Sequence, residues 1–461
     1  MIKKISGFPE YLPQDQMIFS YVIRKLQLLF EQESFIPMDT AAVELIDTLL
    51  SKGNDHEIYG LYRLNGEEKK NLALRFDLTV PLARYVAQNY GQLIFPYRRY
   101  HIAPVWRGER AQSGRYRQFY QCDIDIIGKQ NLEEEYDAEI LSIGCKTLNA
   151  LGLNDFVVKF SSRDILIPLM ILCGFNEDIV FDAIKILDKS TKVSQDQIIN
   201  DLKLLNCSFN LEAIKYILFY NKNIENSPNG KDQIYDVFNN LSQILEFNSK
   251  LIEGYNKLYN IIHKVELLGI SKSQLFFDLS LARGLSYYSG IIFEIVSNSF
   301  KNLGSICAGG RYDNLVSSFH TKEKFPGVGM SIGISRLIPE MINKQMIDKV
   351  SINDVIIIGF ENHLEENKEI NSIINEDNLL VSYHSKIAQI IRDCGLKVQH
   401  YWKRSNLKKQ LEYCNKIGVK IVIIARNDEK IKNIVFVKNM ITGEQKELAL
   451  EELYEYLKNI L

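Results

Sequence analysis

The sequence has few cysteines and no cysteine pattern. It contains seven cysteines in 461 residues, an odd number, and none of them belongs to a CxxC pair. Zinc sites and disulfide frameworks normally show regular spacings, so neither is predicted, and a reducing compartment is the simplest location. We expect Cys122 and Cys307 to be buried, because a free cysteine commonly packs as a small apolar side chain.

Long apolar runs are also missing. No stretch of eighteen apolar residues occurs, and the first residues, MIKKISGFPEYLPQDQ, turn polar almost at once, unlike a secretory leader. The sequence therefore predicts a soluble, cytoplasmic chain without a membrane partner. With 46% apolar residues the chain can bury a large core, and the usual size of domains indicates two or three of them.

The most informative stretch is residues 98–128, RRYHIAPVWRGERAQSGRYRQFYQCDIDIIG. Its first twenty residues hold six arginines and one acid, Glu109, in a chain whose net charge is −2, which predicts a polyanionic ligand. Aromatic and β-branched flanks around the turn at 108–114 predict an antiparallel hairpin. Surface exposure without function remains the alternative for any one arginine. The six are Arg98, Arg99, Arg107, Arg110, Arg115 and Arg117.

The second arm of this hairpin carries a row of polar residues. Gln121, Asp123 and Asp125 are two positions apart, so strand alternation places them on one face, opposite an apolar face. This pattern predicts a binding floor. We expect one arm to hold phosphate and the other to hold a cationic or hydrogen-bonding small molecule.

Two other segments carry candidate site residues. Residues 72–81 alternate like a strand that ends in Asp77 and Thr79 before a helix opened by Pro81, and such residues face a ligand or cap the helix. Residues 275–296 read as two strands joined by a segment with Arg283 and paired tyrosines, and a buried arginine needs a partner. The glycines of 327–336 do not have GxGxxG spacing, which argues against dinucleotide binding.

The remaining chain falls into distinct regions. Residues 163–264 read as mainly helical without recognisable chemistry, and hydrophobic density drops near 344–353. Beyond that point strands and helices alternate, which predicts a small α/β domain in which 361–379 is a loop or surface insertion. Its basic segment 397–409 contains histidine, tyrosine and tryptophan, a combination that suits unpaired RNA bases; a solvated helix start is the alternative.

The chain resembles the histidyl-tRNA synthetases, a family of class II aminoacyl-tRNA synthetases, over almost its whole length. Motif 2 of the class is similar to VWRGERAQSGRYRQFYQCDIDIIG (105–128), and motif 3 to GVGMSIGISRL (327–337). The histidine signatures are LARGLSYY (281–288) and CAGGRYDNL (307–315), which are specific to the family and its paralogues. RFDLTVPLAR (75–84) resembles the eukaryote-like or archaea-like branch more than the bacterial one.

The resemblance implies an α+β fold: an antiparallel-sheet catalytic domain with a helical insertion, plus a C-terminal α/β anticodon-binding domain. It places the catalytic domain at 1–162 and 265–345, the insertion at 163–264 and the anticodon-binding domain at 353–461. It implies a cytoplasmic homodimer that joins histidine to its tRNA through a histidyl-adenylate. ATP would enter as its Mg²⁺ complex, with no tightly bound cofactor and no metal held by protein side chains.

Site residues follow from the matched motifs. The resemblance implies that Arg107 and Arg283 are catalytic. Histidine would be bound by Asp77, Thr79, Gln121, Asp125, Tyr287 and Tyr288. ATP would be bound by Arg107, Glu109, Phe119 and Arg336. Candidate tRNA contacts are Gln112, Arg117, Lys403, Arg404 and Lys408.

Three positions depart from the family pattern. Ala41 stands where proline is usual, Ser286 where aspartate is usual and Ser335 where glutamate is usual. The first puts the dimer interface in doubt, and the others put the support of Arg283 and Arg336 in doubt. A non-catalytic regulatory subunit or a tRNA sensor is therefore the alternative. We expect catalysis, because Arg107, Arg283 and Arg336 are all present together with the C-terminal domain.

Overall fold

The structure is a computed structural model that describes residues 3–50, 58–64, 71–110, 114–190, 193–205, 208–224, 228–282, 288–319, 322–347, 351–361 and 370–460. The chain divides into two compact units. One consists of Met1–Tyr11 and Val22–Met346, and the other of Leu12–Tyr21 and Ile347–Leu461.

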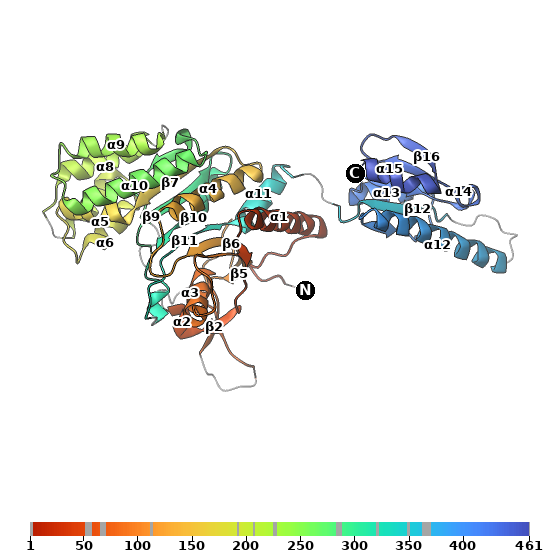
Figure 1. The fold of residues 1–461 in the computed structure, drawn as a ribbon, viewed down its shortest axis with the longest axis horizontal. Helices are drawn as coiled ribbons and strands as arrows, with labels where there is room; N and C mark the ends of the chain where they lie inside the picture. The colour runs from red at the N-terminus through yellow and green to blue at the C-terminus, as the bar shows by residue number, and fades with distance from the viewer. Residues whose placement is uncertain are drawn as a thin grey trace. The chain divides into compact units, whose positions relative to one another are not determined.

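A large sheet forms the centre of the first unit (Figure 1). Within the described residues its strands are β1 (Ile36–Pro37), β5 (Tyr97–Trp106), β6 (Gln118–Ile127), β7 (Phe156–Ser162), β8 (Leu275–Phe277), β9 (Ile291–Ser297), β10 (Ser305–Tyr312) and β11 (Gly327–Ile332). Their order is β1-β5-β6-β11-β10-β9-β7-β8, and neighbours are antiparallel except β1 with β5 and β7 with β8. The pairing of β5 with β6 confirms the predicted hairpin.

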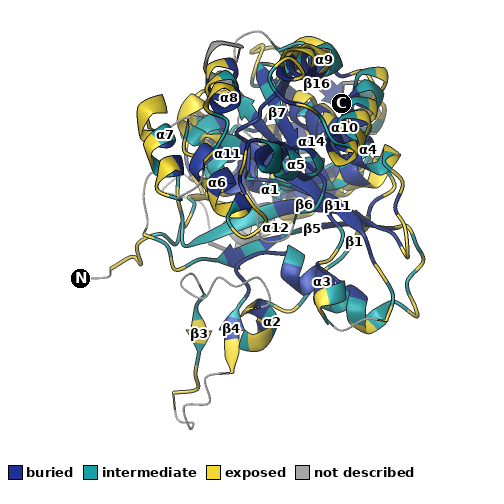
Figure 2. Ribbon diagram, turned by 90° about the vertical axis from the view of Figure 1, so that its left-hand side faces the viewer, coloured by how far each residue is buried: buried dark blue, intermediate teal, exposed yellow. Residues whose placement is uncertain are grey.

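The two faces of the sheet have different surroundings. Residues 22–32 of helix α1 (Pro13–Gln32), which belong to the first unit, and helix α4 (Glu135–Ala150) cover one face. Tyr100 donates a hydrogen bond to Glu31 at 2.8 Å, and Arg98 pairs with Glu139 at 2.9 Å. Arg99 lies on the opposite face, because successive strand residues alternate. Figure 2 shows that β5, β6 and β11 are largely buried. The sheet therefore has a helix-packed face and a second face that bears polar residues.

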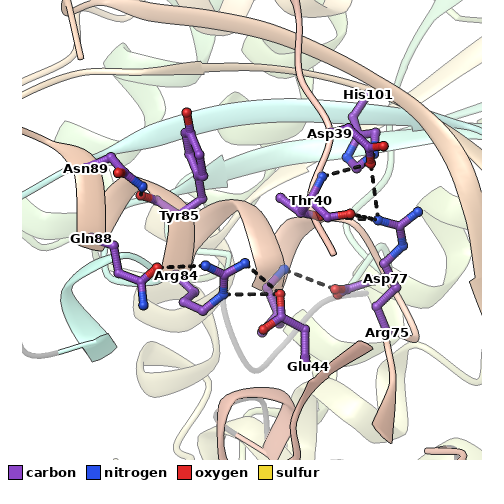
Figure 3. Close-up of polar contacts among 11 residues, drawn as sticks. Asp39, Thr40, Glu44, Arg75, Asp77, Arg84, Tyr85, Gln88, Asn89 and His101 are labelled. Carbon is purple, nitrogen blue, oxygen red and sulfur yellow. Dashed lines mark hydrogen bonds and ion pairs between the residues drawn. The ribbon is translucent and has the colours of Figure 1, made fainter. Parts of the chain in front are cut away.

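A smaller antiparallel sheet precedes the hairpin. It has the order β2 (Val43–Leu45), β4 (Leu72–Leu74), β3 (Gly60–Leu61), and it is accompanied by α2 (Ile46–Leu50) and α3 (Thr79–Asn89). Arg84 of α3 pairs with Glu44 of β2 at 2.7 Å, an ion pair drawn in Figure 3. This contact ties the middle of α3 to the small sheet. Helix α3 begins at Thr79, so the expected helix at Pro81 starts two residues earlier.

Helices follow strand β7 and pack near that end of the large sheet (Figure 1). They are α5 (Arg163–Leu172), α6 (Val180–Leu187), α7 (Gln195–Lys203), α8 (Leu211–Ile224), α9 (Gly230–Leu241) and α10 (Ser249–Leu267). Helix α9 is tied to β8 because the Gln233 side chain accepts a hydrogen bond from the Phe277 amide at 2.9 Å. The chain then returns to the large sheet and ends the first unit in α11 (Ile334–Asn343).

The second unit contains a five-stranded sheet among its described residues, in the order β13 (Val398–His400), β12 (Val355–Ile358), β14 (Ile421–Ile424), β15 (Ile434–Asn439), β16 (Gln445–Ala449). The first three strands are parallel and the last two are antiparallel to their neighbours. Its helices are α12 (Ile370–Asp393), α13 (Leu407–Ile417), α14 (Asn427–Lys432) and α15 (Leu453–Ile460). This arrangement confirms the predicted α/β fold of the C-terminal region.

One local expectation for this unit was wrong. Residues 370–379 belong to α12 and not to a loop; neither proline nor glycine interrupts them, so the helix continues despite its Asn-rich sequence. The last helix, α15, does not begin until Leu453, because residues up to Ala449 pair with β15. Pairing with a neighbouring strand here outweighs the helix propensity of the local sequence.

Candidate active site

A pocket with a cavity volume of about 90 Å³ lies on the polar face of the large sheet. It is lined by Asp77, Thr79, Arg107, Gln121, Asp125, Tyr288, Ala308, Tyr312, Gly329, Met330 and Ser331. These residues come from the start of α3, from the β5–β6 hairpin, from the segment before β9 and from β10 and β11. Six of the predicted site residues, far apart in the sequence, therefore line one small cavity.

Asp77 lies at the pocket wall and also at the start of α3. Its Oδ1 accepts a hydrogen bond from the backbone N–H of Val80 at 3.0 Å, and the side chain is buried (Figure 3). Both interpretations of this residue therefore hold, since one oxygen caps the helix while the carboxylate lines the cavity. Capping fixes the carboxylate in place, which is useful for a group that must meet a ligand's ammonium.

Arg107 is the arginine of the basic hairpin that lines the pocket. Its Nε donates a hydrogen bond to the carbonyl oxygen of Phe76 at 3.0 Å, and its Cζ lies 5.1 Å from the centroid of the Phe119 ring. The guanidinium is therefore held on two sides, by a hydrogen bond and by a cation–π contact. A fixed guanidinium at a small cavity suits a phosphate, whose oxygens it can bind in a bidentate manner.

Asp125 is held from two sides. Its Oδ2 lies 2.5 Å from Nη2 of Arg99, and its Oδ1 accepts a hydrogen bond from the Tyr312 hydroxyl at 2.6 Å. Across the strand pair lies Gly329, where an added Cβ would stand 2.0 Å from Oδ1. The glycine thus leaves the space that the carboxylate fills. Asp125 is a fixed hydrogen-bond acceptor at the pocket floor.

Gln121 and Asp123 continue the polar row along β6. The Gln121 side chain donates a hydrogen bond to the Ser331 hydroxyl at 3.2 Å and lines the cavity. Asp123 is 2% exposed and does not line the cavity. Burial raises the pKa of Asp123 to about 7, an effect that the charge of Arg99 opposes. The row predicted from alternation is present, but its middle member lies beneath the site.

His101 lies opposite Asp123 on the same face and belongs to a second polar network. Its Nε2 is 2.9 Å from Oδ1 of Asp39, which also lies 3.5 Å from Nη1 of Arg75, as Figure 3 shows. Burial, together with the charges of Arg99 and Arg75, lowers the pKa of His101 to about 3. His101 is therefore uncharged near neutral pH, and its Nε2 donates to the carboxylate.

The other residues assigned to ATP lie outside the cavity lining. Glu109 pairs with Arg115 at 3.3 Å, and its carbonyl oxygen accepts from Nε of Arg117 at 3.1 Å. Arg336 belongs to the first turn of α11. The neighbouring departure Ser335 is buried, and its hydroxyl accepts a hydrogen bond from the Tyr120 amide at 2.7 Å, which ties α11 to β6. Gln112, Arg283, Ser286 and Tyr287 lie outside the described residues.

The basic segment of the second unit remains largely exposed. Lys403 and Lys408 are exposed, whereas Arg404 forms an ion pair with Asp377. The Trp402 ring is 50% exposed and stacks on His400 with ring centroids 4.6 Å apart. An exposed aromatic ring beside free lysines is a surface that single-stranded nucleic acid can stack on.

Sequence reasoning gave no role to five residues of the cavity lining, which are Ala308, Tyr312, Gly329, Met330 and Ser331. It also missed that Arg99 contacts Asp125 from outside the lining. Tyr312 lies within the histidine signature 307–315, and Gly329 lies within motif 3. Their place in these motifs was the one signal that could have marked them as site residues. Their role depends on strand register, because Gly329 lies opposite Asp125 and next to Gly310. Arg99 was counted with the phosphate-handling arginines, yet its guanidinium is fully buried on Asp125.

Two features are absent from the described part of the chain. No group of three or more His, Cys, Asp or Glu side chains there is placed to hold a metal ion. Among those residues, no helix has the length and apolar character needed to cross a membrane.

Comparison with known proteins adds two family matches. Residues 7–337 match a family model described as histidyl-tRNA synthetase, and residues 354–460 match one described as anticodon binding domain. The histidine--tRNA ligase of Clostridium acetobutylicum is 36% identical over 456 residues, which are 97% of this chain and 98% of the relative.

Solved structures agree with these matches. The crystal structure of histidyl-tRNA synthetase from Nostoc sp. PCC 7120 superposes with a TM-score of 0.85 at 32% identity and covers all of both chains. A Bacillus halodurans structure titled ATP phosphoribosyltransferase regulatory subunit/histidyl-tRNA synthetase has a TM-score of 0.69 at 21% identity, covering 92% of this chain and 98% of that one. The second likeness concerns the fold alone.

The large antiparallel sheet with its pocket, together with the separate α/β unit, defines a class II aminoacyl-tRNA synthetase. That confirms the fold predicted from the sequence. Within this class, the chain belongs to the histidyl-tRNA synthetase family.

Proposed function

We propose that the chain attaches histidine to its cognate tRNA in two steps, through a histidyl-adenylate made from histidine and ATP. The observation that carries this proposal is the pocket, which gathers Asp77, Asp125 and Arg107 in one small cavity. These groups match an ammonium, a ring N–H and a phosphate, and the chain belongs to a family of histidine-specific ligases. Histidine and ATP must be held side by side before they can be joined. The protein carboxylates hold histidine, and the neighbouring guanidinium of Arg107 holds the phosphate.

Histidine is held at two ends in this proposal. Asp77, Thr79 and Gln121 bind its α-amino group, and the pre-set position of Asp77 on the helix start supports that role. Asp125 and Tyr288 bind the ring nitrogens, with Tyr287 beside them. A ligand that lacks ring nitrogens leaves these buried polar groups unpaired, so selection against isosteres needs no editing site.

ATP is held by the hairpin and by motif 3. Arg107 binds the α-phosphate, Glu109 and the Phe119 ring bind the adenine end, and Arg336 binds the γ-phosphate. Arg283 supplies a second positive charge at the α-phosphate. The nucleotide enters as its Mg²⁺ complex, and no tightly bound cofactor takes part.

The first step is an in-line displacement at phosphorus. A carboxylate oxygen of histidine forms a bond to the α-phosphorus while the bond to the bridging oxygen breaks, and pyrophosphate leaves. The carboxylate is already ionised, so no general base is needed. The protein contributes position and positive charge, because negative charge spreads over the phosphoryl oxygens in the transition state.

In the second step the terminal ribose hydroxyl of the tRNA attacks the adenylate carbonyl, and AMP leaves. Gln112 and Arg117 contact the acceptor end of the tRNA. Lys403, Arg404 and Lys408 bind the tRNA on the second unit, where exposed lysines beside Trp402 support the assignment. Arg404 contributes less than the lysines, because Asp377 already neutralises it.

The domain limits and the assembly extend this proposal. Residues 1–162 and 265–345 form the catalytic domain, 163–264 the helical insertion and 353–461 the anticodon-binding domain. The chain acts as a homodimer, and the exposed apolar side chains of Ile36, Val43 and Leu45 support an interface at this stretch of the chain. Ala41 is exposed in the same stretch. Light scattering on the purified protein measures the assembly.

The branch and the location also remain proposals. The RFDLTVP motif favours the eukaryote-like or archaea-like branch, whereas the relatives named above are bacterial. A tree built from full-length sequences tests this point. The cytoplasmic location is supported by the cysteine pattern and the family, and fractionation of cells tests it.

A non-catalytic regulatory subunit or tRNA sensor is the alternative function. The fold does not decide between the two, because the Bacillus halodurans structure shares it. The match to a histidine--tRNA ligase over 97% of the chain favours catalysis. So does Arg107 in the cavity lining.

Histidine-dependent exchange of pyrophosphate into ATP tests the proposal. We expect exchange with histidine and none with the other amino acids. Binding of histidine without exchange would favour the regulatory alternative, and exchange that depends on a different amino acid would overturn the assignment of the pocket.

A further inference from the structure

We propose that Asp313 is a positioning residue for histidine, because it holds Ser289 and so sets the direction in which Tyr288 enters the pocket. The inference rests on the proposed function, in which Tyr288 binds a ring nitrogen of histidine. Tyr288 lines the cavity, whereas Ser289 and Asp313 do not. Asp313 therefore acts on the ligand through Tyr288.

Ser289 is joined to Asp313 by two hydrogen bonds in opposite directions. The Ser289 hydroxyl donates to Oδ2 of Asp313 at 2.5 Å and accepts from the Asp313 backbone N–H at 3.0 Å. The Ser289 backbone N–H also donates to the carbonyl oxygen of Arg311 at 2.8 Å. Hydrogen bonds to a carboxylate are stronger than those between neutral groups. Ser289 directly follows Tyr288, so these contacts fix the backbone from which the Tyr288 side chain projects.

Asp313 is itself held in place by Arg311. The Nε of Arg311 donates to Oδ1 of Asp313 at 3.0 Å. The Arg311 side chain is buried, its Nη1 pairs with Asp137 of α4 at 2.9 Å, and its Nη2 donates to the carbonyl oxygen of Leu132 at 2.6 Å. A planar guanidinium with partners on three nitrogens keeps one orientation, and so does the carboxylate that it contacts. Arg311 stays paired with Asp137 when the Asp313 carboxylate is removed.

Two glycines let the segments on either side of this cluster interlock. A Cβ added to Gly310 would stand 3.0 Å from Cδ1 of the Tyr288 ring, and one added to Gly290 would stand 3.1 Å from Cδ of Arg311. Each segment therefore leaves room at a glycine for the side chain of the other. Tyr288 has a further interaction of its own, and Asp313 adds to it by fixing the neighbouring backbone.

The tripeptide Arg-Tyr-Asp at 311–313 thus supports both groups that are proposed to contact the imidazole ring. Its central residue, Tyr312, lines the cavity and donates its hydroxyl to Oδ1 of Asp125 at 2.6 Å. The residues on either side do not line the cavity and hold the segment that carries Tyr288. One short stretch of chain therefore fixes the spacing between the two ring contacts.

The dissociation constant of histidine, measured by calorimetry on the full chain, tests the proposal. Ser289→Ala and Asp313→Ala each remove the hydrogen bond between the hydroxyl and the carboxylate. We expect either change to raise the constant about tenfold, which is the usual effect of losing a hydrogen bond to a charged group. Ser289→Thr keeps the hydroxyl and should stay within about twofold of the wild type. The KM for ATP in pyrophosphate exchange should also stay within about twofold in all three variants.

A Tyr288→Phe background separates positioning from a general loss of structure. Tyr288→Phe alone should raise the dissociation constant of histidine about tenfold, because the hydroxyl that meets the ring is gone. Adding Asp313→Ala to it should then change the constant by less than about twofold, since the group that Asp313 positions is already absent. Two independent effects would instead multiply.

Asp155→Ala is the matched control, because Asp155 holds two serines near the other end of β9. Its Oδ1 accepts a hydrogen bond from the Ser297 hydroxyl at 3.1 Å, and its Oδ2 accepts one from the Ser299 hydroxyl. None of these three residues lines the cavity. The change removes a similar aspartate–serine cluster next to the same strand, and the dissociation constant of histidine should stay within about twofold.

An unchanged constant in folded Ser289→Ala and Asp313→Ala would overturn the proposal. So would an equal rise in Asp155→Ala, or a full tenfold rise on adding Asp313→Ala to Tyr288→Phe. If circular dichroism shows that Asp313→Ala does not fold, Ser289→Ala replaces it in each comparison, because it leaves both ion pairs of Arg311 in place. Failure of the proposed function has a different signature, because the wild type would then show no histidine-dependent exchange.

Discussion

Two segments of this chain concentrate positive charge, and the structure uses them in opposite ways. In the hairpin of the first unit, Arg98 pairs with Glu139, Arg99 with Asp125 and Arg115 with Glu109. In the second unit, Lys403, Lys408 and Lys409 are exposed. The first segment pairs three of its six arginines with acids and brings a single arginine, Arg107, to the cavity lining.

This difference shows that a local excess of charge does not identify a ligand by itself. What matters is whether acids distant in the sequence fold back onto the basic residues. Glu139 is 41 positions from Arg98, and no pattern within the hairpin predicts that the two residues pair. We therefore expect substitutions in the first segment to act through fixed geometry, and those in the second to act through screened, long-range attraction.

The largest effect should come from Arg107→Ala. The change removes the guanidinium that Phe76 and Phe119 hold at the cavity, so we expect the rate of histidine-dependent pyrophosphate exchange to fall about 10²- to 10³-fold. Arg98→Met is the control, and its rate should stay within about twofold. An equal loss of rate in both variants would contradict the distinction between Arg107, which lines the pocket, and Arg98, which lies on the helix-packed face of the sheet.

A second prediction concerns stability against pH. Burial raises the pKa of Asp123 to about 7, above its usual value of 3.8. A raised pKa means that the stabilising contribution is complete below pH 4 and is lost as pH rises through 7. Because each pKa unit is worth about 1.4 kcal/mol, the free energy of unfolding should fall by a few kcal/mol between these values.

Asp123→Asn should remove that loss. Urea unfolding of the wild type and the variant at pH 4.5 and pH 8 measures the difference in slope. Substitution of the exposed Asp428 by Asn in the second unit should leave the slope as in the wild type. An unchanged slope in Asp123→Asn would mean that the carboxyl stays ionised in the fold.

The smallest effect should follow charge reversal in the second segment. Changing Lys408 and Lys409 together to Glu should weaken tRNA binding about tenfold at low salt, and less at high salt, because exposed charges are screened. The rate of pyrophosphate exchange should not change. Titration of tRNA at two salt concentrations measures the first effect, and equal loss of binding and exchange would indicate misfolding instead.

The sequence predicted much of this arrangement. Alternation in β6 and the glycine turn were enough for the hairpin and for the shared face of Gln121, Asp123 and Asp125, because both signals are local. The resemblance named six residues that line the pocket.

What the sequence could not predict depends on distant partners. Tyr312 reaches Asp125 from 187 positions away, and Gly329 makes room for it only because β11 lies beside β6. Arg99 looked like a member of the phosphate-binding set because its neighbours in the sequence are basic. Strand alternation separates it from Arg98, and burial on Asp125 removes it from the surface.

The most direct test of the whole account is transfer of an amino acid to tRNA. The purified chain is incubated with ATP, unfractionated tRNA and each amino acid in turn, and charged tRNA is separated on acid gels and sequenced. We predict that histidine alone becomes attached, and to the histidine tRNA alone. Transfer of another amino acid, or adenylate formation from histidine without any transfer, would contradict the account.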